Sequence, residues 1–134
     1  MSSRGSLAIN GHVTTSEYNT VGVTETGAKI LSGQGNNHSL PDYSHTPNSV
    51  YVKLDADGKT AQEIRFYDEK GNLYFEIGYH PESAINNGNR KEKIVHFHNI
   101  NNLNRSSATR MRDNPSVKEK YEKYLKEFGL YDKC

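Results

Sequence analysis

The sequence predicts an α+β fold in which a four-stranded antiparallel meander carries one C-terminal helix on one face. Three observations predict this fold. Between residues 50 and 100, apolar and polar side chains alternate along four short runs separated by turn signals. Between residues 115 and 128, apolar side chains recur at helical spacing instead. Residues 1–49 contain few large apolar side chains and many turn-forming residues.

We expect two parts in the chain. Its 134 residues have the size of a single domain, which we place at residues 50–134 as the sheet and the C-terminal helix. Residues 1–49 are expected to form a polar, poorly structured arm rich in Gly, Asn and Ser, because they can bury little surface. Within this arm, only residues 21–23 and 28–31 have the composition of short strands or of one helical turn.

Composition excludes several classes of protein. With 17 Lys and Arg against 16 Asp and Glu, the net charge is +1, so no field of the whole domain attracts nucleic acid or a membrane. The single cysteine, Cys134, excludes an intramolecular disulfide and a cysteine-rich zinc site. No stretch reaches the ~18 consecutive apolar residues of a membrane helix, and the N-terminus lacks the apolar segment of a signal peptide. We therefore expect a soluble chain.

Four strands follow from the alternation of apolar and polar residues. The first run stops at Asp57-Gly58, which is a strong hairpin signal. The third run ends at Pro81, and a long polar loop is expected after it at residues 82–92. The four runs cover residues 50–55, 64–67, 73–80 and 94–100. Short turns between most of them predict an antiparallel meander.

One helix is expected after the strands. Asn114 suits its N-cap, and Pro115 suits its first position. Gly129 suits the position at which a helix ends. Apolar residues form one stripe at helical spacing, namely Val117, Tyr121, Tyr124, Leu125 and Phe128. We expect this stripe to pack on the apolar face of the sheet.

Alternation also predicts which side chains share a face, because residues two apart on a strand point to the same side of the sheet. The face toward the helix is expected to carry Val52, Leu54, Ile64, Phe66, Leu73, Phe75, Ile77, Val95 and Phe97. The opposite face is expected to carry Tyr51, Lys53, Arg65, Tyr67, Tyr74, Glu76, His80, His96 and His98. Histidine and tyrosine are unusually frequent on that face for a solvated sheet surface.

Three interpretations of this polar face are open. It is a solvated sheet surface, it cleaves a phosphodiester bond without a metal ion, or it binds a metal ion. A metal ion would use His96 and His98 with His80 or Glu76. A single open sheet, however, offers no second layer to enclose an ion. The residue types fit phosphodiester cleavage, so we expect neither a metal ion nor a cofactor.

Metal-independent cleavage of RNA requires a base, an acid and a cation near the phosphate. His96 and His98 lie about 7 Å apart by strand rise and are the expected acid–base pair, with His80 as a third member or orienting group. Arg65 is expected to clamp the phosphate as part of the catalytic set. The expected substrate-binding groups are Lys53, Tyr67, Tyr74, Glu76, Arg105 and Arg110.

Residues 62–100 resemble a recurrent pattern of small effector domains. The pattern joins the hairpin Tyr67-Asp68-Glu69-Lys70-Gly71 and the strand Glu76-Ile77-Gly78-Tyr79 to His80 and then to Val95-His96-Phe97-His98. It is similar to C-terminal effector or cargo domains of phage minor head (MuF-type) proteins and of bacterial polymorphic toxins. A looser similarity is to the barnase–EndoU–colicin–RelE group of metal-independent RNases. Those enzymes place a helical part before a four-stranded antiparallel sheet, whereas the helix expected here follows the sheet.

The resemblance implies a ribonuclease, and therefore a hydrolase, that a larger polypeptide carries as a toxin or cargo module. His80, His96 and His98 are the positions that match the pattern. The implied partners are RNA and a parent polypeptide or an immunity protein, with no membrane. The implied location is the cytoplasm of a target or host cell, or the virion. The alternative function is a non-catalytic virion-associated or protein-interaction domain, because Tyr and Arg are also common interface anchors.

Overall fold

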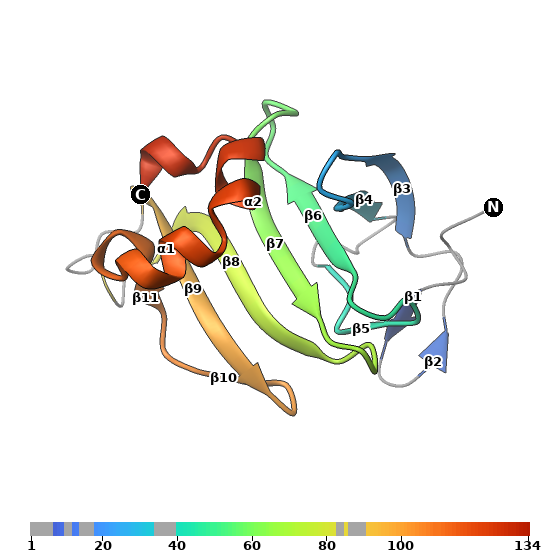
Figure 1. Cartoon of the computed structure of the whole chain (residues 1–134). Coiled ribbons are helices and arrows are strands. Elements are labelled where there is room, and N and C mark those ends of the chain that lie inside the picture. The colour runs from blue at the N-terminus through green and yellow to red at the C-terminus, as the bar shows by residue number, and fades with distance from the viewer. Residues whose placement is uncertain (1–6, 10–11, 14–17, 34–39, 83–84, 86–90) are drawn as a thin grey trace.

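The protein has a mixed α+β fold dominated by strands, with two short helices near the C-terminus (Figure 1). The computed structural model describes residues 7–9, 12–13, 18–33, 40–82, 85 and 91–134. Parts of the expected arm and of the expected polar loop, at 1–6, 10–11, 14–17, 34–39, 83–84 and 86–90, lie outside these described residues.

The main sheet has eight strands in the order β10-β9-β8-β7-β6-β4-β3, with β11 also pairing with β9. Its strands are β3 (Tyr18–Val23), β4 (Lys29–Gly33), β6 (Val50–Leu54), β7 (Ala61–Tyr67), β8 (Leu73–Pro81), β9 (Lys93–Asn101), β10 (Asn104–Arg105) and β11 (Thr109–Arg110). A three-stranded sheet consists of β1 (Leu7–Ile9), β2 (His12–Val13) and β5 (Tyr43–Ser44).

The four strands expected from alternation are β6, β7, β8 and β9. They pair antiparallel in chain order, as expected. The expected four-stranded sheet is nevertheless wrong in its extent, because β4 adds to β6 in parallel and β3 adds to β4. The sheet is therefore mixed and larger than a meander.

The arm before residue 50 contributes to this sheet. Of the short segments expected at residues 21–23 and 28–31, the first lies in β3 and the second in β4, which begins one residue later than expected, at Lys29. These strands can form with few large apolar residues, because the edge of β6 supplies hydrogen-bond partners for β4 and because Ala28 and Leu31 are buried. The expectation of a poorly structured arm is wrong for these residues.

The expected C-terminal helix is two short helices, α1 (Pro115–Lys120) and α2 (Glu122–Glu127), which meet at Tyr121. Asn114 is the N-cap residue, but its side chain donates to Arg110 O (2.9 Å) rather than to the first turn. Gly129 ends α2 as expected, with φ of 72° and a bond from Leu130 N–H to Leu125 O (2.8 Å). This pairing is the Schellman arrangement that ends many helices. Two 3₁₀ turns, η3 (Met111–Asp113) and η4 (Tyr131–Lys133), flank the helices.

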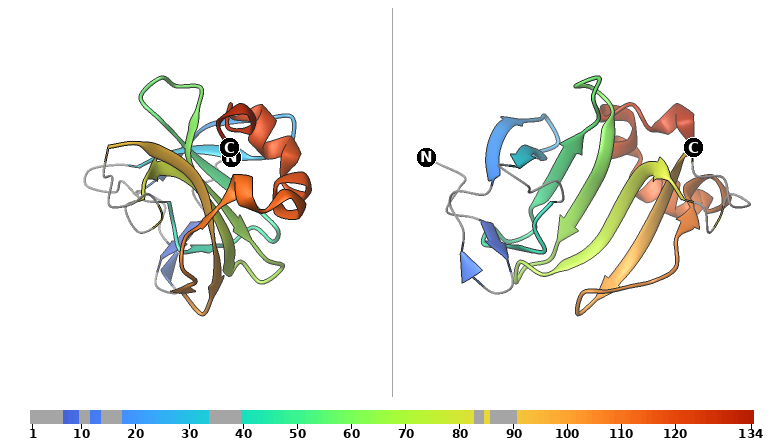
Figure 2. Two further views of the ribbon diagram at one scale, coloured as in Figure 1. Left: turned by 90° about the vertical axis from the view of Figure 1, so that its left-hand side faces the viewer. Right: turned by 180° about the vertical axis from the view of Figure 1, so that it is seen from behind.

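The helices pack on one face of the curved sheet (Figure 2, left). Tyr121 connects the helices to the sheet, because the Tyr121 ring stacks on Phe75 with centroids 4.4 Å apart and also contacts Phe66. Seven of the nine residues expected on this face are buried in its core, namely Val52, Ile64, Phe66, Phe75, Ile77, Val95 and Phe97, and Leu54 packs against them. The expected packing of helix on sheet is therefore confirmed.

A β-bulge in β8 exchanges two side chains between the faces. The register of β7 and β8 pairs Phe66 with Phe75 but Tyr67 with Leu73, which leaves Tyr74 as an extra residue. Leu73 consequently lies in a second cluster on the opposite face, and the Tyr74 hydroxyl bonds with Tyr121 on the helix side. The expected faces of Leu73 and Tyr74 are both wrong for this reason.

The face opposite the helices is not an open wall along its whole width. The chain around Pro41 and Ser44 covers Tyr51 and Tyr67, which are fully buried. The Tyr67 hydroxyl donates to Pro41 O, and the Tyr51 hydroxyl lies 2.6 Å from Ser44 Oγ. Together with Leu31, Leu40, Leu73 and Ile100, these tyrosines form the second core. The histidines lie beyond it, on β8 and β9.

Candidate functional site

Three histidines, which we call the histidine cluster, lie on the sheet face opposite the helices: His80, His96 and His98. In the register of β8 and β9, His96 is opposite Gly78 and His98 is opposite Glu76. The alternate residues Val95 and Phe97 are in the core beneath the helices. The ring centroids of His80 and His96 are 4.5 Å apart, and those of His96 and His98 are 5.4 Å apart. The expected projection of the three imidazoles away from the helices is therefore observed.

Each imidazole of the cluster has Nδ1 next to a main-chain carbonyl. Nδ1 of His96 lies 2.8 Å from Ile94 O, and Nδ1 of His98 lies 2.8 Å from Ser106 O. Nδ1 of His80 lies 3.2 Å from Pro81 O. A carbonyl oxygen only accepts, so Nδ1 carries the proton in each case. In the neutral rings the lone pair is then on Nε2, which is available to a proton or a metal ion.

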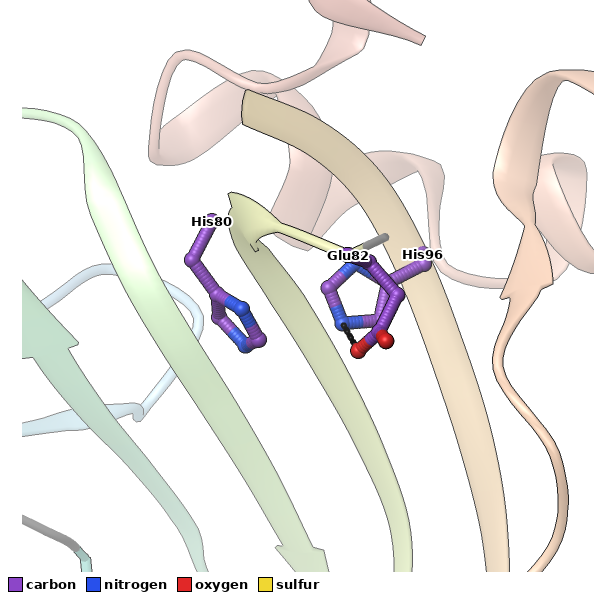
Figure 3. A group of neighbouring side chains, drawn as sticks. All are labelled: His80, Glu82 and His96. Carbon is purple, nitrogen blue, oxygen red and sulfur yellow. Dashed lines mark ion pairs between the residues drawn. The ribbon is translucent and has the colours of Figure 1, made fainter. Parts of the chain in front are cut away.

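His96 is the most enclosed member of the cluster. Its side chain is 0% exposed, whereas His80 and His98 are half-buried. Burial lowers the pKa of His96, and the neighbouring His80 and His98 lower it further. Among the described residues, its Nε2 has no hydrogen-bond partner, and the nearest carboxylate oxygen is Glu82 Oε2 at 3.8 Å. The buried Nε2 lone pair of His96 therefore faces the carboxylate of Glu82 (Figure 3).

Gly78 leaves room beside two of these nitrogens. A Cβ at this position would lie 2.9 Å from Nε2 of His80 and 2.9 Å from Nε2 of His96. Its φ is not in the left-handed region, so the constraint is space rather than backbone conformation. The two ring nitrogens therefore converge over the backbone of Gly78.

Arg65 does not lie free on this face. Its guanidinium donates from Nε to Glu76 Oε2 (2.6 Å) and from Nη1 to Leu40 O (2.7 Å), and Asp42 and Glu63 complete its ion pairs. The side chain is only 5% exposed. Carboxylates and carbonyls surround the group, so its placement favours a structural role over the expected phosphate clamp.

Glu76 shares this buried network. It pairs with both Arg65 and Arg105. Burial raises its pKa, but the two guanidinium groups lower it more, and the net direction is downward. Burial raises the pKa of Glu63, which lies opposite Gly78 in the sheet. A carboxylate held by two arginines is poorly placed to bind substrate or a metal ion, so the expected roles of Glu76 are not favoured.

The other expected substrate-binding residues are dispersed. Tyr67 is buried under Pro41, and Tyr74 lies on the helix side. Lys53 is half-buried on β6, two strands from β8. Arg105 and Arg110 are on the short strands that border β9, and Arg110 is opposite His96. Arg110 is therefore directly beside His96 in the register, and Arg105 pairs with Ile100, two residues after His98.

Glu82 is the site residue that the sequence interpretation missed. Its carboxylate and one ring nitrogen each of His80 and His96 form a group whose ligand atoms all lie within 4.8 Å of one another. The signal was present in the sequence, because Glu82 is two residues after His80 and continues the alternation of β8 past Pro81. Gly78 was also missed as a part of the site, since its role depends on the register with His96.

No family model matches the chain, and neither the curated proteins nor the solved structures contain a match. Among the described residues, no helix is both long enough and apolar enough to span a bilayer. The case for a function therefore rests on the geometry of the histidine cluster.

Proposed function

We propose that the histidine cluster is the active centre of a metal-independent, RNA-cleaving domain of the phage minor head or polymorphic-toxin type. One observation carries the proposal. His80, His96 and His98 share a face of the sheet, and each has its Nδ1 next to a main-chain carbonyl, which leaves the Nε2 lone pairs available for proton transfer. Imidazole is the side chain best suited to proton transfer near neutral pH.

The reaction consists of two coupled proton transfers at one phosphate. One imidazole Nε2 removes the proton of the ribose 2′-hydroxyl as that oxygen forms a bond to phosphorus. A second, protonated imidazole donates its proton to the 5′-oxygen as the phosphorus–oxygen bond breaks. The expected acid–base pair was His96 and His98, but the His96 side chain is 0% exposed. His80 and His98 are half-buried and therefore take these two roles, while His96 adjoins both rings and positions them.

The phosphate requires positive charge near the histidines. Arg105 and Arg110 border β9, and the Arg105 side chain is 38% exposed. Both have partners, since Arg105 pairs with Glu76 and Arg110 Nε donates to Ile85 O (3.0 Å). Arg65 is enclosed by its ion pairs, so the more exposed Arg105 is better placed than Arg65 to contact the RNA backbone. In this proposal Arg65 and Glu76 act through structure, by fixing the strands that carry the histidines.

Incubation of the folded protein with total RNA in EDTA tests the proposal. We expect cleavage by the wild-type protein, and a loss of about 100-fold or more in His98→Ala and His80→Ala. His45→Ala is the matched control, because His45 is exposed and outside the cluster, and it is expected to cleave normally. Absence of cleavage by the folded wild-type protein would contradict the proposal and favour the non-catalytic, virion-associated or protein-interaction alternative. Normal cleavage by both cluster variants would also contradict it.

A further inference from the structure

The Nε2 atom of His96 is the polar atom whose placement the proposed RNA cleavage explains least. It is buried, it accepts no hydrogen bond from the described residues, and it faces the Glu82 carboxylate at 3.8 Å. A lone pair and a carboxylate that face each other without a proton between them are both electron-rich. Such an arrangement is unfavourable unless a cation lies between them.

We propose that His80, Glu82 and His96 bind a divalent transition-metal ion of the zinc class. The inference goes beyond the proposed RNA cleavage and does not depend on it. The ion would occupy the Nε2 lone pair of His80 that the cleavage uses, so the zinc-bound form and the cleaving form are alternative states of the same residues. Three features carry it: the buried Nε2 of His96, the convergence of His80 Nε2 on the same space, and the carboxylate at its border (Figure 3). His80 and His96 are on neighbouring strands, and Glu82 directly follows β8.

The distances between the three ligand atoms would suit a bound ion after these atoms move slightly closer together. The three ligand atoms lie within 4.8 Å of one another. Zinc ligands at about 2.0–2.1 Å in tetrahedral geometry lie about 3.3 Å apart. The carboxylate of Glu82 supplies this adjustment most readily, because Glu82 is beyond the end of β8 and is half-buried. Gly78 keeps the space above the sheet free of a Cβ at a place that both Nε2 atoms approach.

The hydrogen bonds of the rings agree with ligation. Histidines that bind metals through Nε2 normally donate the Nδ1–H to a carbonyl or carboxylate, which fixes the ring. Here His96 donates to Ile94 O and His80 lies next to Pro81 O. Both rings are therefore oriented before any ion binds.

The donor set selects the class of ion. Two imidazole nitrogens and one carboxylate oxygen suit zinc and neighbouring transition metals, whereas calcium and magnesium favour sets made of oxygen atoms. Three protein ligands also leave the ion a fourth position for water.

Isothermal titration of the metal-stripped full chain with ZnCl₂ tests the site. We expect one equivalent to bind, with affinity lower by at least about tenfold in Glu82→Gln and in His80→Ala. His98→Ala and His45→Ala are the controls and should bind as the wild-type protein does. Circular dichroism of each variant shows whether it is folded. Glu82→Gln is the decisive variant, because Glu82 is not part of the core.

The inference is overturned if the folded wild-type protein binds no zinc, or if Glu82→Gln and His80→Ala both bind it unchanged. The titration contains no RNA, so its outcome is separate from that of the cleavage assay. Zinc binding without RNA cleavage would contradict only the proposed function, and RNA cleavage without zinc binding would contradict only the metal site.

Discussion

At the scale of single residues, Gly78 and Arg65 explain how the histidine cluster is held. Gly78 provides the space over which Nε2 of His80 and His96 converge. Arg65 ties β7 to Glu76 on β8 and to the chain at Leu40. Neither residue has an open polar atom directed at a substrate in this arrangement. Both residues act by fixing the positions of the imidazoles.

Replacing Gly78 by alanine should displace both rings. The new Cβ would lie 2.9 Å from two ring nitrogens, closer than ordinary contact. We expect a loss of about 1–3 kcal/mol in the free energy of unfolding, as for other overpacked sites, together with weaker zinc binding. Gly22→Ala is the matched control, since its nearest side-chain contact is an ordinary 3.9 Å. Equal stability and zinc affinity in Gly78→Ala and the wild type would contradict the described geometry.

Removing the Arg65 guanidinium should destabilise the protein strongly. Arg65→Ala leaves the buried carboxylates of Glu63 and Glu76 without their main partner, and breaking such a buried pair costs about 3–5 kcal/mol. Urea unfolding measures the change. Arg112→Ala is the control, because its pair with Asp113 is exposed at 3.8 Å and should matter by less than about 1 kcal/mol. A loss for Arg65→Ala no larger than the control's would show that the network is not structural.

The same network predicts loss of stability in acid. The pKa of Glu76 is lowered in the folded protein by Arg65 and Arg105, despite the opposing effect of burial. Its contribution is therefore complete above the usual pKa of a glutamate and is lost as the pH falls through the lower folded value. Glu63 acts in the opposite direction, because burial raises its pKa. We expect the unfolding free energy to fall between about pH 5 and pH 3, and to fall less steeply in Glu76→Gln. Identical slopes would exclude Glu76 as the cause.

At the scale of elements, period-two alternation predicted β6, β7, β8 and β9 and the faces of most of their side chains. It failed where the period was interrupted. The bulge at Tyr74 moves one residue out of register, so Leu73 and Tyr74 change faces. A bulge depends on the pairing of two strands, and the sequence of one strand carries no clear signal for it.

The end of α2 gives a test at this scale. Gly129 has φ of 72°, in the left-handed region that Ala disfavours. Gly129→Ala should therefore lower the free energy of unfolding by about 1–2 kcal/mol. Thermal unfolding followed by circular dichroism measures this change. Lys126→Ala, one turn earlier on an exposed position, should be nearly neutral, and an equally small effect at Gly129 would argue against the Schellman end.

At the scale of the whole molecule, the N-terminal segment is the feature that the sequence predicted least well. Its strands are short, and their stability comes from partners distant in the chain, such as β6. The faces of the histidines could be predicted because alternation is local. The enclosure of Arg65, Tyr51 and Tyr67 could not, because it depends on the chain around Pro41 folding over them.

Because the chain around Pro41 covers Tyr51 and Tyr67, we expect the stable folding of residues 50–134 to depend on the segment before them. A fragment that begins at residue 50 would expose Tyr51 and Tyr67, which are now 0% and 1% exposed, and would leave the edge of β6 without β4. We expect the fragment to lose cooperative thermal unfolding. A fragment that unfolds with the midpoint of the full chain would show instead that the covering segment contributes little.

The protons of the histidine cluster can be located directly. Long-range nitrogen–proton NMR correlations of the metal-stripped protein report which ring nitrogen carries the hydrogen. We expect the Nδ1–H form for His80, His96 and His98. We also expect a shift of the Nε2 signals of His80 and His96, but not of His98, when one equivalent of ZnCl₂ is added. An Nε2–H form at His96, or Nε2 signals of His80 and His96 that do not respond to zinc, would contradict these expectations.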